Sequence, residues 1–290
     1  MAALPQPAAL AFAGVGNAPQ AAFFDPERLL VGRRAPTHYG HGSAREEVDV
    51  LASGWTDAAT AARLTAKALV EIEAVLARPD QPFVLTSGLA SPVYIDCRRI
   101  ISFPRVRRTI VELLAGLVLE AVGFERVQAV AGGETAGIPF AAWLADRLAL
   151  PMLYVRKKPK GFGRNARIEG ALEPGTDVLL VEDLTTDGGS KLGFAEALRE
   201  AGGRVSEAVV IFYYDVFPQA LARLESHGLR LHWLATWRDV LAEARRTGYF
   251  DAATCRHIET FLADPLAWSR DHGGIGAIPF AAEGQEGTGG

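Results

Sequence analysis

The chain has 290 residues, of which 49% are hydrophobic, and its formal net charge is −4. This length suits one sizeable core with a small second lobe, and the negative balance excludes a global basic field for nucleic acid, so an anionic ligand would need a local basic cluster. No apolar run reaches the roughly 18 residues that span a membrane, and the N-terminus lacks a signal peptide's order of basic then apolar residues, so we expect a soluble, cytoplasmic protein with no membrane partner.

The two ends of the chain differ in composition from its middle. Residues 1–54 are rich in Ala, Pro and Gly without sustained periodicity, which predicts a disordered or loosely docked extension. Residues 273–290 predict a flexible tail for the same reason. The folded domain is therefore expected over residues 55–272.

Segments typical of helices and strands alternate through this domain. Thr56 or Asp57 is a candidate cap for a helix over 58–77, where apolar residues recur at helical spacing. Short strands are predicted over 83–86 and 93–97, around a turn. Further helices are predicted over 105–122, 138–148 and 191–201, and further strands over 127–131, 152–155, 177–181, 208–214 and 231–236. This alternation predicts an α/β fold whose mostly parallel sheet is covered by helices and binds ligands at the carboxyl ends of its strands.

The sharpest local signal is a strand that ends in two carboxylates and leads into a glycine loop. Glu182 and Asp183 follow the apolar residues 178–181, and Leu-Thr-Thr-Asp-Gly-Gly-Ser follows them. Glycines allow close approach of an anion, and a helix N-terminus and hydroxyl groups add donors. A phosphate would fit this loop, and the carboxylates would accept hydrogen bonds from ribose hydroxyls. A plain strand-to-helix turn is the alternative, whereas a Walker loop is excluded because its Lys-Ser/Thr pattern is absent.

A basic segment and a second glycine-rich turn complete the motifs. Six basic residues and no acidic one occur between Arg156 and Arg167, in a stretch with Pro and Gly residues that indicate a movable loop. In an acidic chain such a cluster favours a polyanionic ligand, although a solvated surface loop or a nucleic-acid patch would have the same composition. The glycine-rich turn, residues 132–137, is predicted to break a buried strand and to point backbone amides at an anion.

These motifs resemble those of type I phosphoribosyltransferases, and in particular of orotate phosphoribosyltransferases. The acidic pair and its loop resemble the phosphoribosyl-pyrophosphate motif. Residues 156–170 resemble the family's flexible loop, residues 131–139 its pyrophosphate loop, and residues 83–96 an early segment of the orotate branch. The resemblance implies the type I fold, with a small hood over about 55–104, a core over about 105–240 and C-terminal helices to 272.

The resemblance also implies a reaction and the residues that serve it. Orotate and 5-phosphoribosyl 1-pyrophosphate would give orotidine 5′-phosphate and pyrophosphate, with Lys160, Arg156 and Asp183 as catalytic residues. Tyr94, Ile95 and Thr186 would contact orotate. The residues implied for phosphoribosyl pyrophosphate are Glu134, Thr135, Ala136, Arg156, Lys157, Lys160, Glu182, Asp183, Leu184, Thr185, Thr186, Asp187, Gly188, Gly189 and Ser190. Mg²⁺, held mainly by the substrate, is the implied cofactor, and the implied assembly is a homodimer that shares its flexible loop.

The sequence departs from the family pattern in four places, three of them single residues and the fourth a pair. Thr86 and Ala136 stand where lysine is common, and Phe162 stands where many members have histidine. Tyr214 and Asp215 stand where many members have Asp-Arg, whose arginine touches the carboxylate side of the base. These departures leave two alternatives open: transfer to another base such as a purine, or a regulatory protein that binds phosphoribosyl pyrophosphate or nucleic acid without turnover.

Overall fold

The computed structural model describes residues 56–85, 87–160, 167–217 and 219–277. The expectations for residues 1–54, for Thr86 and Phe162 and for most of the tail lie outside these residues. Asp57 is confirmed as a helix cap, because its Oδ1 accepts a hydrogen bond of 3.0 Å from the Thr60 N–H. Within the described ranges, no helix is both long and apolar enough to cross a membrane.

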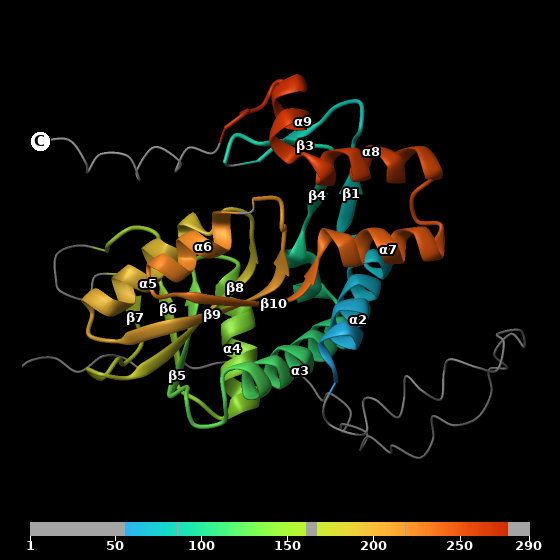
Figure 1. Ribbon diagram of the computed structural model, residues 1–290. Helices are drawn as coiled ribbons and strands as arrows, with labels where there is room; N and C mark the ends of the chain where they lie inside the picture. The colour runs from blue at the N-terminus through green and yellow to red at the C-terminus, as the bar shows by residue number, and fades with distance from the viewer. Residues whose placement is uncertain (1–55, 86, 161–166, 218, 278–290) are drawn as a thin grey trace, which may run out of the picture. The chain divides into compact units, whose positions relative to one another are not determined.

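A six-stranded sheet forms the centre of the described part of the chain (Figure 1). Its order is β10-β9-β8-β5-β6-β7, and neighbouring strands are parallel except β7, which runs antiparallel to β6. The strands are β5 (Ala129–Gly133), β6 (Met152–Val155), β7 (Ile168–Glu169), β8 (Asp177–Thr185), β9 (Arg204–Tyr213) and β10 (Arg230–Thr236). The predicted α/β class with a mostly parallel sheet is confirmed.

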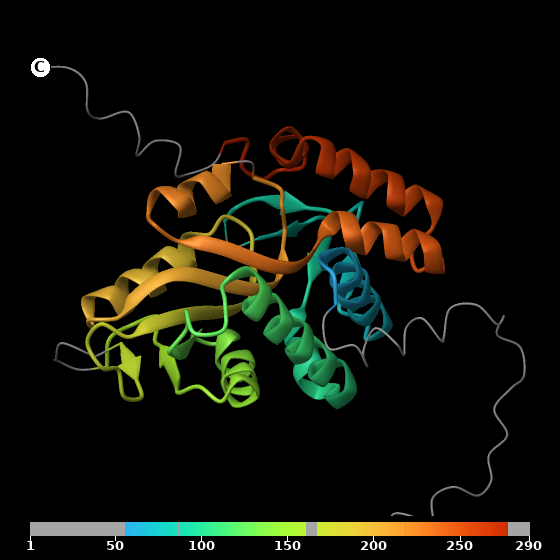
Figure 2. The same cartoon turned by 60° about the horizontal axis from the view of Figure 1, so that its bottom comes forward.

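Helices cover both faces of this sheet because successive strand residues point to opposite sides. In β8, Leu179 belongs to one buried cluster and Leu180 to the other. The first cluster includes residues of α2 (Ala58–Glu71), α3 (Pro104–Ala121) and α4 (Gly137–Leu148), and the second includes residues of α5 (Gly189–Glu200) and α6 (Gln219–Ser226). Figures 1 and 2 show α3 and α4, in green, on the opposite side of the sheet from α5 and α6.

Short strands and the C-terminal helices pack together beyond one end of the sheet (Figure 1). The strand β1 (Val75–Ala77) pairs with β4 (Val93–Ile95), and β2 (Phe83–Val84) pairs with β3 (Ala90–Ser91). A 3-10 helix, η2 (Cys97–Ser102), follows β4. The remaining helices are α7 (Trp237–Thr247), α8 (Ala252–Ala263) and α9 (Pro265–Asp271). Ser269 of α9 accepts a hydrogen bond of 2.9 Å from the Ala90 N–H, which ties the C-terminal helices to β3.

Three expected elements differ from those observed. The helix predicted over 58–77 ends at Glu71, because Glu73 has a left-handed φ of 54° that an α-helix does not continue, and residues 75–77 form β1 instead. The strands near 83–86 and 93–97 do not pair with each other. Gly132 and Gly133 were expected to interrupt the strand over 127–131, but they are the last two residues of β5. The strand β8 runs on past the acidic pair to Thr185.

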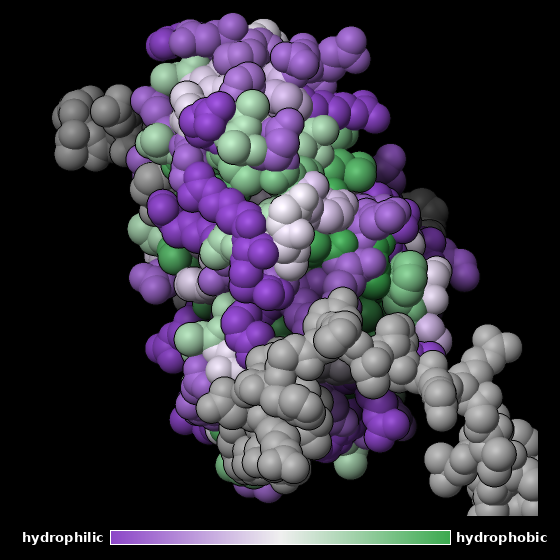
Figure 3. All heavy atoms as spheres, turned by 90° about the vertical axis from the view of Figure 1, so that its right-hand side faces the viewer, coloured by the Kyte–Doolittle hydropathy of each residue, from purple (hydrophilic) through white to green (hydrophobic). Residues whose placement is uncertain are grey.

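The side of the molecule that carries α7 and α2 is mainly hydrophilic (Figure 3). Helix α7 buries Trp237, Val240 and Ala244, whereas Arg238 on the same helix keeps 73% of its side chain exposed. One apolar stripe with a charged outer face is typical of a helix that packs on a core from its surface.

Candidate active site

A cavity of about 520 Å³ collects residues from the sequence motifs at the carboxyl end of β8. Its walls come from the short strands, η2 and the ends of β8 and β9, with residues before α4, after β6 and at the start of α5. They consist of Val84, Leu85, Ser87, Tyr94, Ile95, Arg98, Ala136, Lys157, Glu182, Asp183, Leu184, Thr185, Thr186, Asp187, Ser190, Lys191 and Tyr214. This is the position at which parallel α/β sheets bind ligands.

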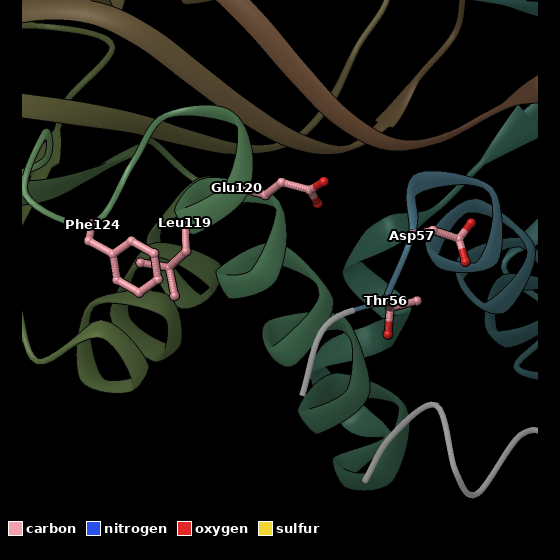
Figure 4. Close-up of a pocket in the computed structure, with 5 residues that line it drawn as sticks. All are labelled: Thr56, Asp57, Leu119, Glu120 and Phe124. Atoms are coloured by element: carbon pink, nitrogen blue, oxygen red, sulfur yellow. The ribbon is translucent and has the colours of Figure 1, made fainter. Parts of the chain in front are cut away.

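A second cavity, of about 510 Å³, lies between the start of α2 and the end of α3. Figure 4 shows its residues: Thr56 and Asp57 immediately precede α2, Leu119 and Glu120 lie at the end of α3, and Phe124 follows α3. None of them belongs to the acidic, basic or glycine motifs. The cavity at β8 is therefore the candidate active site.

Glu182 and Lys191 form a buried ion pair in the wall of the site. Lys191 Nζ lies 2.7 Å from Glu182 Oε2, and the two side chains are 4% and 9% exposed. The same ammonium donates to the Leu184 carbonyl oxygen and, at 3.2 Å, to Ser190 Oγ. A buried charge with several hydrogen-bond partners is held in one position, so Lys191 fixes the carboxylate of Glu182.

Asp183 is the second carboxylate of the site, and its environment raises its pKa. Burial is the larger cause and repulsion by Glu182 the next, and together they raise the pKa of Asp183 to about 6, against a lowering by Lys191. At pH 7 most Asp183 side chains are therefore ionised, while at pH 5 most are protonated. The ionised form accepts hydrogen bonds only, as binding to ribose hydroxyls requires.

The loop after β8 has the conformation that its glycines permit. Gly188 has φ 80°, a left-handed value that suits glycine, and α5 begins at Gly189. The Gly188 N–H donates to Thr185 Oγ1 and the Gly189 N–H to Asp187 Oδ1, each over 3.2 Å. An anion that took these two amides would replace the hydroxyl and the carboxylate as their acceptors.

Close packing explains the glycines of the second turn. A Cβ added to Gly133 would lie 2.6 Å from Glu182 Oε1 and 2.6 Å from the Phe194 ring. A Cβ added to Gly137 would meet the Val181 carbonyl oxygen. The absence of side chains at these positions lets the ends of β5 and β8 and the start of α4 approach one another around Glu182.

Gly133→Ala is expected to lower the free energy of unfolding by about 1–3 kcal/mol, because overpacking forces Glu182 or Phe194 to move. Urea unfolding measures this change. Gly116→Ala is the matched control: it lies in α3, a Cβ there would meet no heavy atom within 4 Å, and alanine favours helix by up to about 1 kcal/mol. Equal stability of Gly133→Ala and the wild type would contradict the close approach.

Tyr94, Ile95, Arg98 and Tyr214 form the part of the cavity wall that comes from β4, η2 and the residue after β9. The Ile95 N–H donates to Tyr214 Oη over 3.3 Å, and the buried Tyr214 ring packs edge-on against Phe212 and Trp237. Tyr94 accepts a hydrogen bond from Arg98 Nη2 over 3.2 Å. Tyr214 therefore joins the short strands to the central sheet at the position where the family pattern has aspartate.

The basic residues that border the undescribed residues 161–166 face different surroundings. Lys157 lines the cavity, and its backbone N–H donates to Glu134 Oε2 over 2.7 Å. Arg156 Nη1 lies 3.4 Å from Glu169 Oε1, outside the cavity walls. Lys160 is exposed. Glu134 thus connects the start of the basic segment to the glycine-rich turn, residues 132–137.

Comparison with known proteins identifies the family. No model of a known protein family matches the chain. It is 61% identical over 207 residues to an orotate phosphoribosyltransferase of Cereibacter sphaeroides, a match that covers 71% of this chain and 89% of the relative. It is 53% identical over 229 residues to that of Sinorhizobium medicae, covering 79% and 99%. The chain belongs to the orotate phosphoribosyltransferase family.

Solved structures agree with this family assignment. The orotate phosphoribosyltransferase of Aeropyrum pernix matches with a TM-score of 0.54 and 34% identity over 64% of this chain and 99% of that one. The UMP synthase of Leishmania donovani matches with a TM-score of 0.60 and 26% identity over 75% of this chain and 44% of that one. The fold and family inferred from the motifs are therefore confirmed.

The structure brings most of the residues implied by the family to one cavity. Its walls include Tyr94, Ile95, Ala136, Lys157, Glu182, Asp183, Leu184, Thr185, Thr186, Asp187 and Ser190. The residues outside its walls are Glu134, Thr135, Arg156, Lys160, Gly188 and Gly189. The individual roles of all these residues stay predictions.

Two charged residues of the cavity, Lys191 and Arg98, were not expected from the sequence. Lys191 stands in the first turn of α5, where a positive charge is unfavourable beside the positive end of the helix dipole. This unfavourable position is the feature of the sequence that could have indicated a special role for Lys191. Arg98 follows β4 as one arginine of a pair and has no comparable signal. Only the folded structure shows that both side chains line the cavity.

Proposed function

We propose that this chain transfers the phosphoribosyl group of 5-phosphoribosyl 1-pyrophosphate to orotate in the cytoplasm, as a step of pyrimidine biosynthesis. The observation that carries the proposal is one cavity that joins a carboxylate pair, a glycine and hydroxyl loop and an aromatic, apolar end. Relatives that are 53–61% identical over most of their length are orotate phosphoribosyltransferases.

The geometry suggests a task for each part of the site. Glu182, held by Lys191, and ionised Asp183 would accept hydrogen bonds from the ribose hydroxyls. Thr185, Thr186 and Ser190, with the start of α5, would hold the 5-phosphate. The hydrogen bond from its backbone N–H to Glu134 holds Lys157 beside the glycine-rich turn, where it would face the departing pyrophosphate. Binding at several fixed points orients C1 of the ribose toward the base.

The reaction forms a bond from a ring nitrogen of orotate to C1 while the bond from C1 to the pyrophosphate oxygen breaks, and the ring nitrogen gives up its proton to the departing pyrophosphate or to water. The electron pair of that bond leaves with pyrophosphate, so stabilisation of the leaving charge matters more than a strong base. Lys157, Lys160 and Arg156 are the residues that we propose for this task. Mg²⁺ would supply further charge neutralisation on the pyrophosphate oxygens.

The acidic residues of the site fit a magnesium ion that the substrate also coordinates. Mg²⁺ prefers oxygen ligands and binds through one or two carboxylates together with substrate phosphates. Glu182 and Asp183 line the cavity, and Glu182 is already committed to Lys191. We propose that the ribose and pyrophosphate oxygens hold the ion with no direct protein ligand, that Asp183 binds the ribose beside it, and that chelation of Mg²⁺ abolishes turnover.

We further propose a homodimer in which the basic segment of one subunit reaches the site of its partner. The family resemblance supports it, and Lys160 at the border of that segment is exposed and lies outside the cavity of its own chain. Mixing two inactive variants, Lys160→Ala and Asp183→Asn, tests the arrangement. Restored activity in the mixture is expected, because one of the two shared sites of a heterodimer would contain neither substitution. A mixture as inactive as the separate variants would contradict the sharing of the segment.

The pKa of Asp183 predicts a pH dependence for the capture of phosphoribosyl pyrophosphate. The pKa is raised to about 6, so the carboxylate becomes protonated as pH falls through about 6. We expect kcat/KM for phosphoribosyl pyrophosphate to be constant from pH 7 to 8 and to fall about tenfold per pH unit below 6. A profile that stays flat down to pH 5 would contradict the role of the ionised carboxylate.

A panel of bases tests the choice of orotate. Orotate, uracil, adenine and hypoxanthine are each supplied with phosphoribosyl pyrophosphate and Mg²⁺, and pyrophosphate release is measured. Release with orotate alone, or at least about 100-fold faster with it, is expected. Faster release with a purine would overturn the proposed substrate while leaving the phosphoribosyl chemistry in place.

A further inference from the structure

The carboxylate of orotate needs a cationic partner that the end of β9 does not supply. A carboxylate that enters a protein cavity loses hydration and is stabilised by a charge-assisted hydrogen bond. Tyr214, at the family's aspartate position, has its hydroxyl engaged with the Ile95 N–H. Asp215, at the arginine position, is itself anionic, lies outside the cavity walls and has Arg238 Nε 3.8 Å from its Oδ2.

Among the described residues, three cationic side chains line the cavity: Arg98, Lys157 and Lys191. Lys191 is buried against Glu182, Leu184 and Ser190, so its donors are occupied. The backbone N–H of Lys157 donates a hydrogen bond to Glu134 of the glycine-rich turn. The cation beside Tyr94 and Ile95, where the base is proposed to lie, is Arg98.

The guanidinium of Arg98 is held in place with donors to spare. Its Nε donates to Asp96 Oδ1 over 2.8 Å and its Nη2 to Tyr94 Oη over 3.2 Å, which fixes the plane of the group. Its Nη1 has no hydrogen-bond partner in the part of the chain that the structure describes, and 57% of the side chain is exposed. A fixed, planar cation with a free edge suits a carboxylate.

We propose that Arg98 binds the carboxylate of orotate and thereby selects orotate over pyrimidines that lack this group. The inference rests on the proposed function and assigns the base specificity of the same site. It also explains how the chain dispenses with an arginine at position 215, because the cation comes from η2 instead of from the end of β9.

A purely structural role for Arg98 makes a different prediction. In the ion pair between Arg98 and Asp96 the side chains are 57% and 29% exposed, and pairs that solvent reaches contribute little to stability. Loss of Arg98 should therefore leave the melting temperature nearly unchanged, and its effect should appear in the Michaelis constant of one substrate. A structural residue would instead affect both substrates and the stability together.

Steady-state kinetics of Arg98→Met tests the proposal. We expect KM for orotate to rise about 30-fold, in keeping with loss of a charge-assisted hydrogen bond, while KM for phosphoribosyl pyrophosphate changes less than about twofold. Arg98→Lys keeps the charge but loses the planar group, so its KM for orotate should lie between the two. Arg238→Met, which removes the exposed cation beside Asp215, is the matched control and should leave both constants unchanged.

Three results would overturn the role of Arg98. They are an unchanged KM for orotate in Arg98→Met, a parallel rise of both Michaelis constants with a lowered melting temperature, and a selective rise in Arg238→Met. A wild-type protein that does not turn orotate over would refute the proposed function itself. The two failures are therefore distinguishable, because the first set is measured against an active wild type.

Discussion

Replacing Lys160 with alanine is expected to lower kcat about 100-fold or more while leaving the fold intact. Lys160 is exposed and lies outside the cavity walls, so its loss removes no packing. Its expected contribution is made when the basic segment carries its charge to the departing pyrophosphate, and loss of one preorganised donor typically costs a factor of 10²–10³. Initial rates at saturating orotate and phosphoribosyl pyrophosphate measure this effect.

Lys158→Ala is the matched control for Lys160→Ala. It removes an equally charged and exposed lysine from the same segment, but from a position for which the family resemblance implies no contact. A fall in kcat of less than about threefold is expected for it. An unchanged kcat in Lys160→Ala, or equal losses in both variants, would show that the segment acts through its general charge or not at all.

Replacing Lys191 with methionine should lower the free energy of unfolding by about 3–5 kcal/mol. The change leaves the buried Glu182 without its cation beside a second carboxylate, and an uncompensated buried charge is strongly destabilising. Because whole domains are stable by only about 5–15 kcal/mol, the loss is large. Urea unfolding at pH 7 measures it, and a loss below about 1 kcal/mol would contradict the buried pair.

A double variant separates the ion pair from the packing around it. Glu182→Leu combined with Lys191→Met removes both charges, so most of the lost stability should return. In Lys191→Met alone, removal of the cation that lowers the pKa of Asp183 should raise that pKa further. The acid limb of kcat/KM for phosphoribosyl pyrophosphate should then move to higher pH, and a limb that stays near 6 would show that Lys191 does not act on Asp183.

The sequence was sufficient to predict the elements that carry a strong local pattern. The run from Val178 to Val181 predicted the centre of β8, although the strand runs on through the two carboxylates to Thr185. Thr186, Asp187 and Ser190 of the loop that follows line the cavity, as the motif indicated. Burial on both faces of a parallel strand requires a continuous apolar run, which is why this signal is clear. The positions of α4, β6 and β10 followed from equally regular patterns.

Elements that depend on distant contacts could not be predicted in this way. Val75–Ala77 continues the apolar spacing of α2, so only the backbone turn at Glu73 and the pairing with β4 reveal a strand. Gly133 was interpreted as a strand break, whereas the crowding around Glu182 makes glycine necessary inside β5. Arg98 and Lys191 reach the cavity from separate parts of the chain, and their surroundings exist only in the folded protein.

The most direct test of the proposed activity follows the ultraviolet absorbance of orotate in a mixture of the purified protein, phosphoribosyl pyrophosphate and Mg²⁺. We predict a loss of orotate that depends on Mg²⁺ and is matched mole for mole by released pyrophosphate. No loss of orotate under these conditions, from a folded protein that still binds phosphoribosyl pyrophosphate, would contradict the proposed activity.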